Sequence, residues 1–127
     1  DIDRTYWAFL CIDHFKLLPS YVARATNEAA PVPVTGAGLL DVTVWQQKSS
    51  LTVHLVNLTN PMMMKGPVRE LIPLSEQRVR VRLPGGLKAK AVHLLVANRT
   101  AESRQAGEWL DVTVPSILAH EVVAVDV

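Results

Sequence analysis

Apolar and polar side chains alternate one by one along most of the chain beyond Gly38, and this period of two predicts β-strands. The clearest case begins at Leu51, where Leu51, Val53 and Leu55 fall on one face of an extended chain and the residues between them on the other. Turn residues separate such segments, and no helical pattern lies between them. The pattern covers residues 40–44, 51–56, 70–74, 78–83, 92–96, 110–114 and 121–127. We therefore expect a mainly β fold, an antiparallel β-sandwich of six to seven strands.

The turns predict how neighbouring strands pair. Residues 46–50 are few enough to join the strands on either side of them as a hairpin. Pro84, Gly85 and Gly86 form a second turn, so we expect strands 78–83 and 92–96 to pair antiparallel as well. The polar segment 98–107 is predicted to be a loop. The pentapeptide Leu-Asp-Val-Thr-Val occurs at 40–44 and again at 110–114, and we interpret it as one strand pattern used twice, not as a duplication.

A period of three to four residues runs from Arg4 to Thr26 and predicts an amphipathic helix. Its apolar stripe consists of Trp7, Leu10, Cys11, Leu18, Tyr21, Val22 and Ala25. Pro19 lacks a backbone donor, so we expect a kink, or two short helices that meet near Leu18. The chain is therefore predicted to have a helical segment at 1–28, a Pro- and Gly-containing linker at 29–38, and a β-sandwich domain at 39–127.

Two sets of apolar side chains are not needed by the strands and are candidates for an interface. One set is the start of the helical stripe, and the other is a run of methionines that follows the turn at Pro61. The candidates are Trp7, Leu10, Cys11, Met62, Met63 and Met64. Flexible methionine side chains adapt to irregular partner surfaces, although such a loop can also fold back over its own sheet. We predict that both sets contact other domains or another protomer.

Composition excludes several classes of protein. Hydrophobic residues make up 49% of the 127 residues and charged residues 20%, which is ordinary for a globular domain. The formal charge of +1 gives no field that would attract nucleic acid or an acidic membrane, so we expect neither as a partner. No apolar run reaches the roughly 20 residues of a membrane span. A single cysteine excludes an internal disulfide and leaves a cytoplasmic location as the default expectation.

Catalytic chemistry is not indicated, and we predict no catalytic residue, no metal site and no cofactor. Asp41 and Asp111 occupy matching outward positions in the repeated pentapeptide, where solvated carboxylates are the usual finding. Cys11 and His14 lie three residues apart, but no second pair of ligands with metal-site spacing follows. The three other histidines are isolated strand residues, for which structural hydrogen bonding is the plain interpretation. The arginines at 78, 80 and 82 would form a row on one face, solvated more often than anion-binding.

Trp45 and Trp109 fall on the outward side of their strands. Indole rings in such positions can stack on sugar rings, which makes both residues candidates for a carbohydrate contact. Burial against another element or domain is the other interpretation, because tryptophan is common at interfaces. Both interpretations stay open at the level of sequence.

The run HLVNLTNPMMMKGP, the closing PSILAHEVVAVDV and the opening DIDRTYW resemble the C-terminal region of bacterial glycoside-hydrolase-like proteins of the hypothetical glycosyl hydrolase 6 type. Such proteins are similar in layout to the family 42 β-galactosidases, with a catalytic barrel, a middle α/β domain and a terminal β-domain. The resemblance implies that the helical segment is the tail of the middle domain. It also implies that the catalytic carboxylates belong to a barrel outside this chain, so that none is assigned to a residue here.

We therefore expect a non-catalytic C-terminal accessory domain that serves packing and assembly in a glycoside-hydrolase-like protein. Its partners would be the preceding domains of the parent protein or another protomer. The alternative is a carbohydrate-binding module that uses Trp45 or Trp109. An enzyme active on its own ranks third, since the sequence shows no pair of carboxylates placed for glycoside hydrolysis.

Overall fold

The computed structural model describes residues 12–27, 30, 32–59 and 70–127. The interface candidates Trp7, Leu10, Cys11, Met62, Met63 and Met64 therefore lie outside the described residues, and their predicted role stays a prediction. The chain divides into two compact units, Asp1–Pro31 and Val32–Val127, and each is described by itself.

The first unit contains the helix α2, Ile12–Thr26. Of the two predicted alternatives at Pro19, two separate short helices are not found, because α2 is a single helix that continues through Pro19; the kink stays a prediction. A proline removes one hydrogen bond from the helical ladder, and the turns on either side continue. The helix ends where predicted: Asn27 adopts a positive φ of 52°, and its N–H donates to the carbonyl of Ala23 at 2.9 Å. Asparagine tolerates this left-handed conformation, which stops the helix.

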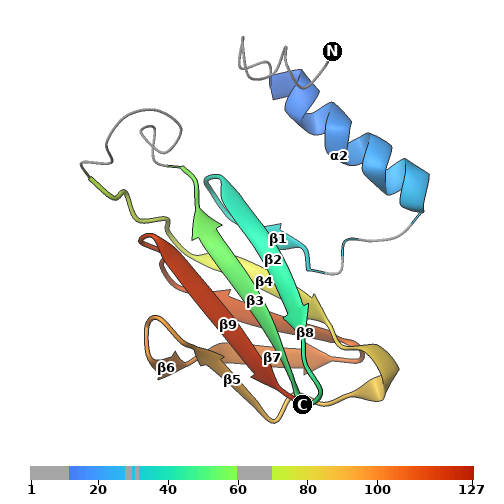
Figure 1. Cartoon of the computed structure of the whole chain (residues 1–127), viewed down its shortest axis with the longest axis vertical. Coiled ribbons are helices and arrows are strands. Elements are labelled where there is room, and N and C mark those ends of the chain that lie inside the picture. Colours follow the sequence, from blue (N-terminus) through green and yellow to red (C-terminus); the bar gives the residue numbers. More distant parts are fainter. Residues whose placement is uncertain (1–11, 28–29, 31, 60–69) are drawn as a thin grey trace. The chain divides into compact units, whose positions relative to one another are not determined.

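The second unit is an antiparallel β-sandwich, so the predicted fold class is confirmed (Figure 1). One sheet has four strands in the order β1-β4-β8-β7, and the other has five in the order β2-β3-β9-β5-β6. The four-stranded sheet consists of β1 (Val34–Thr35), β4 (Gln77–Arg82), β7 (Glu102–Ala106) and β8 (Trp109–Val114). The five-stranded sheet consists of β2 (Leu40–Gln46), β3 (Ser50–Asn57), β5 (Ala91–Leu94), β6 (Arg99–Thr100) and β9 (His120–Asp126).

Three short strands were not predicted. β1 lies in the segment assigned to the linker, and β6 and β7 lie in the segment assigned to a loop. A strand of two residues is too short to show a period, and β7 is an edge strand whose largely exposed residues lack apolar alternation. The segment 70–74 forms no strand, and only Leu74 pairs, in an isolated bridge with Ile117.

One predicted pairing is confirmed and one is wrong. β2 and β3 form the expected antiparallel hairpin. β4 and β5 do not pair, because they belong to different sheets: β4 lies between β1 and β8, whereas β5 lies between β9 and β6. The turn Pro84–Gly86 has left-handed glycines at 85 and 86, and the chain then crosses to the other sheet. Gln105 holds this crossing, since its side-chain oxygen accepts from the N–H of Ala89 and its amide donates to the carbonyl of Leu87.

The core lies between the two sheets and comes from the alternating residues of both. The row Leu51, Val53 and Leu55 on β3 is buried, as its alternation predicts. The corresponding row of β2, Leu40, Val42 and Val44, packs against the same core but stays half-buried. The repeated pentapeptide therefore occupies two unlike places, the edge strand β2 and the interior strand β8.

Candidate functional site

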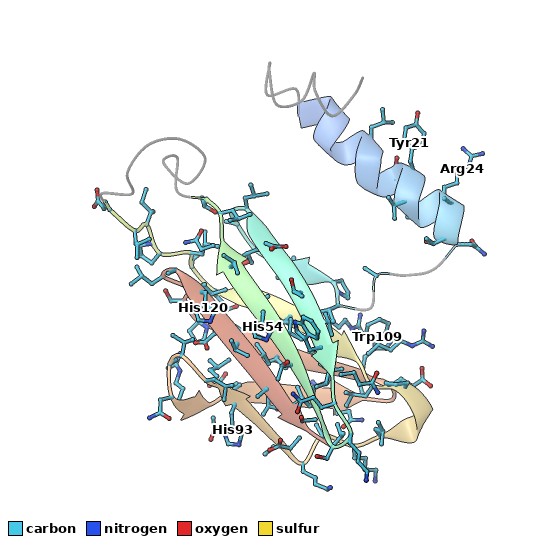
Figure 2. All side chains as sticks on the ribbon, in the orientation of Figure 1. Tyr21, Arg24, His54, His93, Trp109 and His120 are labelled. Atoms are coloured by element: carbon cyan, nitrogen blue, oxygen red, sulfur yellow. The ribbon has the colours of Figure 1, made fainter. Side chains whose placement is uncertain are left out.

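The two tryptophans proposed as carbohydrate contacts lie on different sheets. Trp45 projects from the outer face of β2 and is 61% exposed. Trp109 projects from the outer face of β8 and is half-buried (Figure 2). The two sheets pack face to face, so their outer faces point away from each other. The tryptophans are thus both outward, as predicted, but they cannot form one platform for a sugar chain.

Trp109 already has a partner in the arginine row. The guanidinium of Arg80 lies 5.1 Å from the centroid of the Trp109 ring, within the range of a cation–π contact. Arg80 Nε also lies 3.2 Å from Asp111 Oδ1. Arg78 and Arg82 are paired in the same way, with Glu76 at 3.5 Å and Glu108 at 3.2 Å. This row is a solvated face of paired charges and offers no free cationic site to an anion.

The outer face of the five-stranded sheet carries Trp45 and three histidines, which are His54 on β3, His93 on β5 and His120 on β9. In the strand register, Trp45 is opposite Thr52, Thr52 is opposite Ala124, and Ala124 is opposite His93. His54 is opposite Val122 in the next row (Figure 2). The part of the chain that the structure describes contains no group of three or more side chains placed to hold a metal ion. Trp45 is the large exposed apolar side chain that the described residues place on this face.

Six exposed apolar side chains lie in loops at one end of the second unit, which is here called the apolar end. Its members are Leu39, Leu71, Ile72, Leu95, Val96 and Leu118, each between 38% and 54% exposed. All lie in loops at the end of the sandwich where β2 and β9 begin and where β3 and β5 finish (Figure 1). Among the described residues of this unit, only two other large apolar residues, Trp45 and Leu87, are comparably exposed.

Buried polar side chains hold the loops of the apolar end in place. The amide of Asn57, which is 4% exposed, donates to the carbonyls of Ile72 and Leu118, both at 2.8 Å. The carboxylate of Glu121, which is 3% exposed, accepts from the N–H groups of Val96 at 2.8 Å and Ala97 at 3.0 Å. These hydrogen bonds hold the backbone of residues that carry exposed apolar side chains. The loops of the apolar end therefore have a defined conformation.

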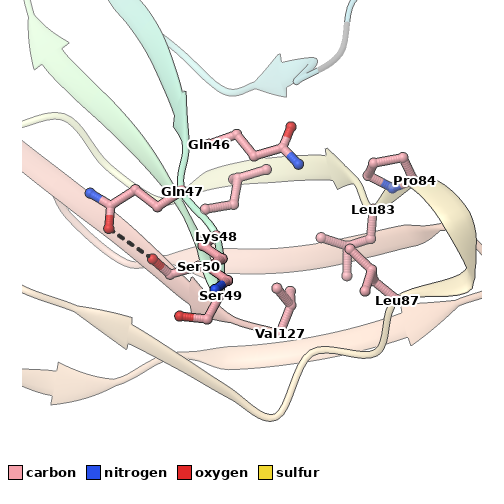
Figure 3. Close-up of a pocket in the computed structure, with 10 residues that line it drawn as sticks. Gln46, Gln47, Lys48, Ser49, Ser50, Leu83, Pro84, Leu87 and Val127 are labelled. Atoms are coloured by element: carbon pink, nitrogen blue, oxygen red, sulfur yellow. Dashed lines mark hydrogen bonds between the residues drawn. The ribbon is translucent and has the colours of Figure 1, made fainter.

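None of the pockets lined by described residues resembles a catalytic cleft. The pocket in Figure 3 measures about 130 Å³, well under the roughly 300 Å³ at which ordinary ligand sites begin. It lies between the β2–β3 turn and the chain after β4, and it is lined by residues 46–51, Leu83, Pro84, Leu87 and Val127. Within its wall, the Ser50 hydroxyl donates to Gln47 Oε1 at 3.3 Å.

A larger hollow of about 290 Å³ lies beside β6 and β7 and includes two acids, Glu76 and Glu102. Both residues are exposed, and the Glu76 carboxylate is paired with Arg78. A glycosidase keeps one of its two carboxyls in surroundings that hold a proton on it, usually an apolar pocket. Neither acid has such surroundings, so the geometry gives no support to catalysis here.

The sequence missed the apolar end, although one signal for it was present. Each member lies outside the alternating part of a strand, in or next to a loop, where an apolar side chain is not required by the core. Leu95 and Val96 were assigned to a strand, but the strand ends at Leu94. An apolar residue in a loop bounded by proline, as at Ile72 and Leu118, is the pattern that could have marked this surface.

Comparison with known proteins gives a likeness of fold. No protein-family model and no curated protein matches the chain. Among solved structures it is similar to the α-L-fucosidase isoenzyme 2 from Paenibacillus thiaminolyticus, with a TM-score of 0.79 and 19% sequence identity. The match covers 98% of this chain and 19% of the fucosidase, so the chain spans about a fifth of that protein's length. No helix among the described residues is long and apolar enough to cross a membrane.

Proposed function

We propose that this chain is an accessory domain of a glycoside-hydrolase-like protein and that the apolar end is the surface by which it packs against the rest of that protein. The observation that carries the proposal is the presence of six exposed apolar side chains in loops at one end of the sandwich, where buried polar groups hold the backbone. Monomeric proteins seldom leave such a surface in contact with water unless something covers it. Covering the exposed half of one side chain of this size contributes about 1 kcal/mol.

The likeness to a fucosidase supports the identity of the parent. A chain whose fold recurs as a fifth of a glycosidase is most simply a domain of a similar enzyme. The partner is then the preceding part of the same protein or another protomer, and the layout of family 42 β-galactosidases is the arrangement we favour. The interface candidates of the methionine run and the helical stripe, and the cytoplasmic location, stay predictions.

The apolar end is tested with an environment-sensitive dye and two matched variants. The chain should enhance the fluorescence of anilinonaphthalene sulfonate, and Leu95→Ser together with Leu118→Ser should remove most of that enhancement. Leu87→Ser is the control, because Leu87 is 40% exposed but belongs to the chain after β4 and not to the apolar end. A native chain without dye binding, or an equal loss in the control, would remove the packing proposal.

The parent is tested by reading the genomic DNA upstream of the codon for Asp1. An open frame that continues upstream and encodes a barrel with two carboxylates would support a glycoside-hydrolase-like parent. A stop codon and a separate promoter directly upstream would contradict it.

The exposure of Trp45 favours a second candidate function, carbohydrate binding. A ring that is 61% exposed on a sheet face can stack on a sugar. Calorimetric titration with oligosaccharides should then show binding that Trp45→Ala abolishes and Trp109→Ala leaves in place, since Arg80 occupies the Trp109 ring. Flat titrations across neutral oligosaccharides would exclude this function.

Catalysis by the chain alone is the remaining alternative. We expect no turnover of aryl glycosides, because neither acid of the hollow beside β6 and β7 is shielded from water. Turnover that Glu76→Gln or Glu102→Gln abolishes would establish an enzyme and refute this expectation.

A further inference from the structure

The edge strand β2 differs from the other exposed edges of the sandwich. Antiparallel sheets normally protect their edges by short strands, charged side chains, prolines or bulges. β1 and β6 are two residues long, and β7 carries Glu102 and Arg104. β2 has seven residues, Leu-Asp-Val-Thr-Val-Trp-Gln, and pairs with β3 without a bulge. Asp41 is its one charge, so β2 has almost none of the usual protection.

The register shows which backbone groups β2 leaves open. The carbonyl of Leu39 accepts from the N–H of Leu58, and the N–H of Gln47 donates to the carbonyl of Ser50, so the odd-numbered residues face β3. Because hydrogen-bonded positions alternate in an antiparallel pair, the N–H and C=O groups of Leu40, Val42, Val44 and Gln46 point away from β3. No described strand pairs with them on that side.

The side chains of β2 are also incompletely covered. The row Leu40, Val42 and Val44 faces the core but is half-buried, whereas Val53 and Leu55 on the neighbouring strand are fully buried. A further strand beside β2 would extend the sheet and cover this row from the open side. An additional extended strand beside β2 would therefore both pair with the open backbone groups and cover the half-buried apolar row.

We infer that β2 pairs antiparallel with the β2 strand of a second copy of this chain, across a twofold axis that passes through Thr43. This alignment uses all seven residues and places Val42 opposite Val44, Leu40 opposite Gln46, and Asp41 opposite Trp45. The open groups of the even-numbered residues then form four hydrogen-bonded pairs, or about eight hydrogen bonds. Like charges do not meet, because the two Asp41 side chains lie at opposite ends of the seam. The result is one continuous sheet of ten strands from two five-stranded sheets.

A second copy fits better than a strand of unrelated sequence because twofold pairing of a strand with itself closes after two chains. The alignment centred on Thr43 is also the one that leaves no residue of β2 unpaired. This interface meets the apolar end at Leu39, the residue before β2, whereas the other five members of the apolar end lie outside β2 and can be covered by the parent protein.

A charged side chain introduced at position 43 tests whether the twofold axis passes through this residue. Sedimentation equilibrium should show a dimer of the unaltered chain, and Thr43→Lys should give a monomer, because the two lysines would be directly opposite each other. Thr43→Glu should do the same for the same reason. Mixing the Thr43→Lys chain with the Thr43→Glu chain should restore the dimer, which shows that neither variant has failed to fold. Dimers that persist in either variant alone, or a mixture that stays monomeric, would overturn the inference, as would a monomeric unaltered chain.

Disulfide trapping provides a second readout in a Cys11→Ser background. Thr43→Cys should form a covalent dimer on mild oxidation, since a residue on the axis at a non-hydrogen-bonded position has its Cα about 4.5 Å from its own copy. Asp41→Cys is the matched control, because residue 41 faces residue 45 of the second copy and not itself. Cross-linking of the Asp41→Cys chain with none at position 43 would contradict the proposed register.

Discussion

At the scale of single residues, the described part of the molecule depends on three buried polar side chains, Asn57, Gln77 and Glu121. Each satisfies backbone groups of loops that have no strand partner. Gln77, for example, donates from its amide to the carbonyls of Ala37 and Ser75, both at 3.0 Å. A buried polar group stabilises only while its partners are present, so each of these residues is sensitive to substitution.

Glu121→Gln should lower the free energy of unfolding by about 1–3 kcal/mol, because one carboxylate oxygen becomes an NH₂ group that cannot accept from the turn at Val96 and Ala97. Urea denaturation followed by circular dichroism measures the change. The control is Glu102→Gln, an exposed position where a change within about 0.5 kcal/mol is expected. Equal effects at the two positions would show that the carboxylate of Glu121 does not hold the turn.

None of these three roles could be predicted from the sequence. Alternation identifies which strand residues are buried, and Leu51, Val53 and Leu55 are buried as expected. Gln77 lies directly before the predicted strand 78–83, and a polar residue there is no sign of burial. Ala37, one partner of Gln77, lies 40 residues away in the chain, and Val96, one partner of Glu121, lies 25 residues away; such contacts have no local signature. The apolar end differs, because its signal, apolar residues in loops bounded by proline, is local and is present in the sequence.

At the scale of elements, the sequence predicted the positions of the strands better than the partner of each strand. The β2–β3 hairpin follows from a short turn, whereas β4 and β5 enter different sheets although a Pro-Gly-Gly turn follows β4. The choice depends on which sheet has room for β5, and that is a property of the assembled sandwich.

Position within the sheet should decide how much a core residue contributes. Leu55→Ala, on the interior strand β3, should lower the free energy of unfolding by about 2–5 kcal/mol because the side chain is fully buried. Leu40→Ala, on the same sheet face of edge strand β2, should have less than half that effect, because Leu40 is half-buried. Chemical denaturation of both variants measures the difference, and equal losses would contradict the burial pattern.

The helix α2 should gain stability when Pro19 is replaced. A proline inside a helix is about 3 kcal/mol less favourable than alanine, so Pro19→Ala should increase hydrogen-exchange protection of the amides from Tyr21 to Thr26. The control is Ser20→Ala, where a change of about 0.5 kcal/mol or less is expected. Protection that stays the same in the Pro19 variant would mean that the continuous helix is not formed in solution.

At the scale of the whole molecule, the boundary of the β-unit lies earlier in the chain than the sequence suggested. The linker was predicted to end at residue 38, but β1 at Val34–Thr35 already pairs with β4. The carbonyl of Ala37 is also a partner of the buried Gln77. The contacts of the second unit therefore begin near Val32, where the chain divides into two.

Two shortened chains test this boundary. A chain of residues 32–127 should unfold in one cooperative transition, because it keeps every strand of both sheets. A chain of residues 39–127 should have a lower midpoint of urea denaturation, because it lacks β1 and the carbonyl of Ala37. Midpoints that coincide would place the start of the folded unit at the predicted linker end after all.

The repeated pentapeptide allows the same five residues to be compared in two places of one molecule, at 40–44 and at 110–114. The same five residues form part of the edge strand β2 and of the interior strand β8. Val42 is therefore half-buried, whereas Val112 is 2% exposed. Any difference between the two sites in exchange, oxidation of neighbouring groups or tolerance to substitution arises from location alone, since composition, solvent and temperature are shared within one polypeptide.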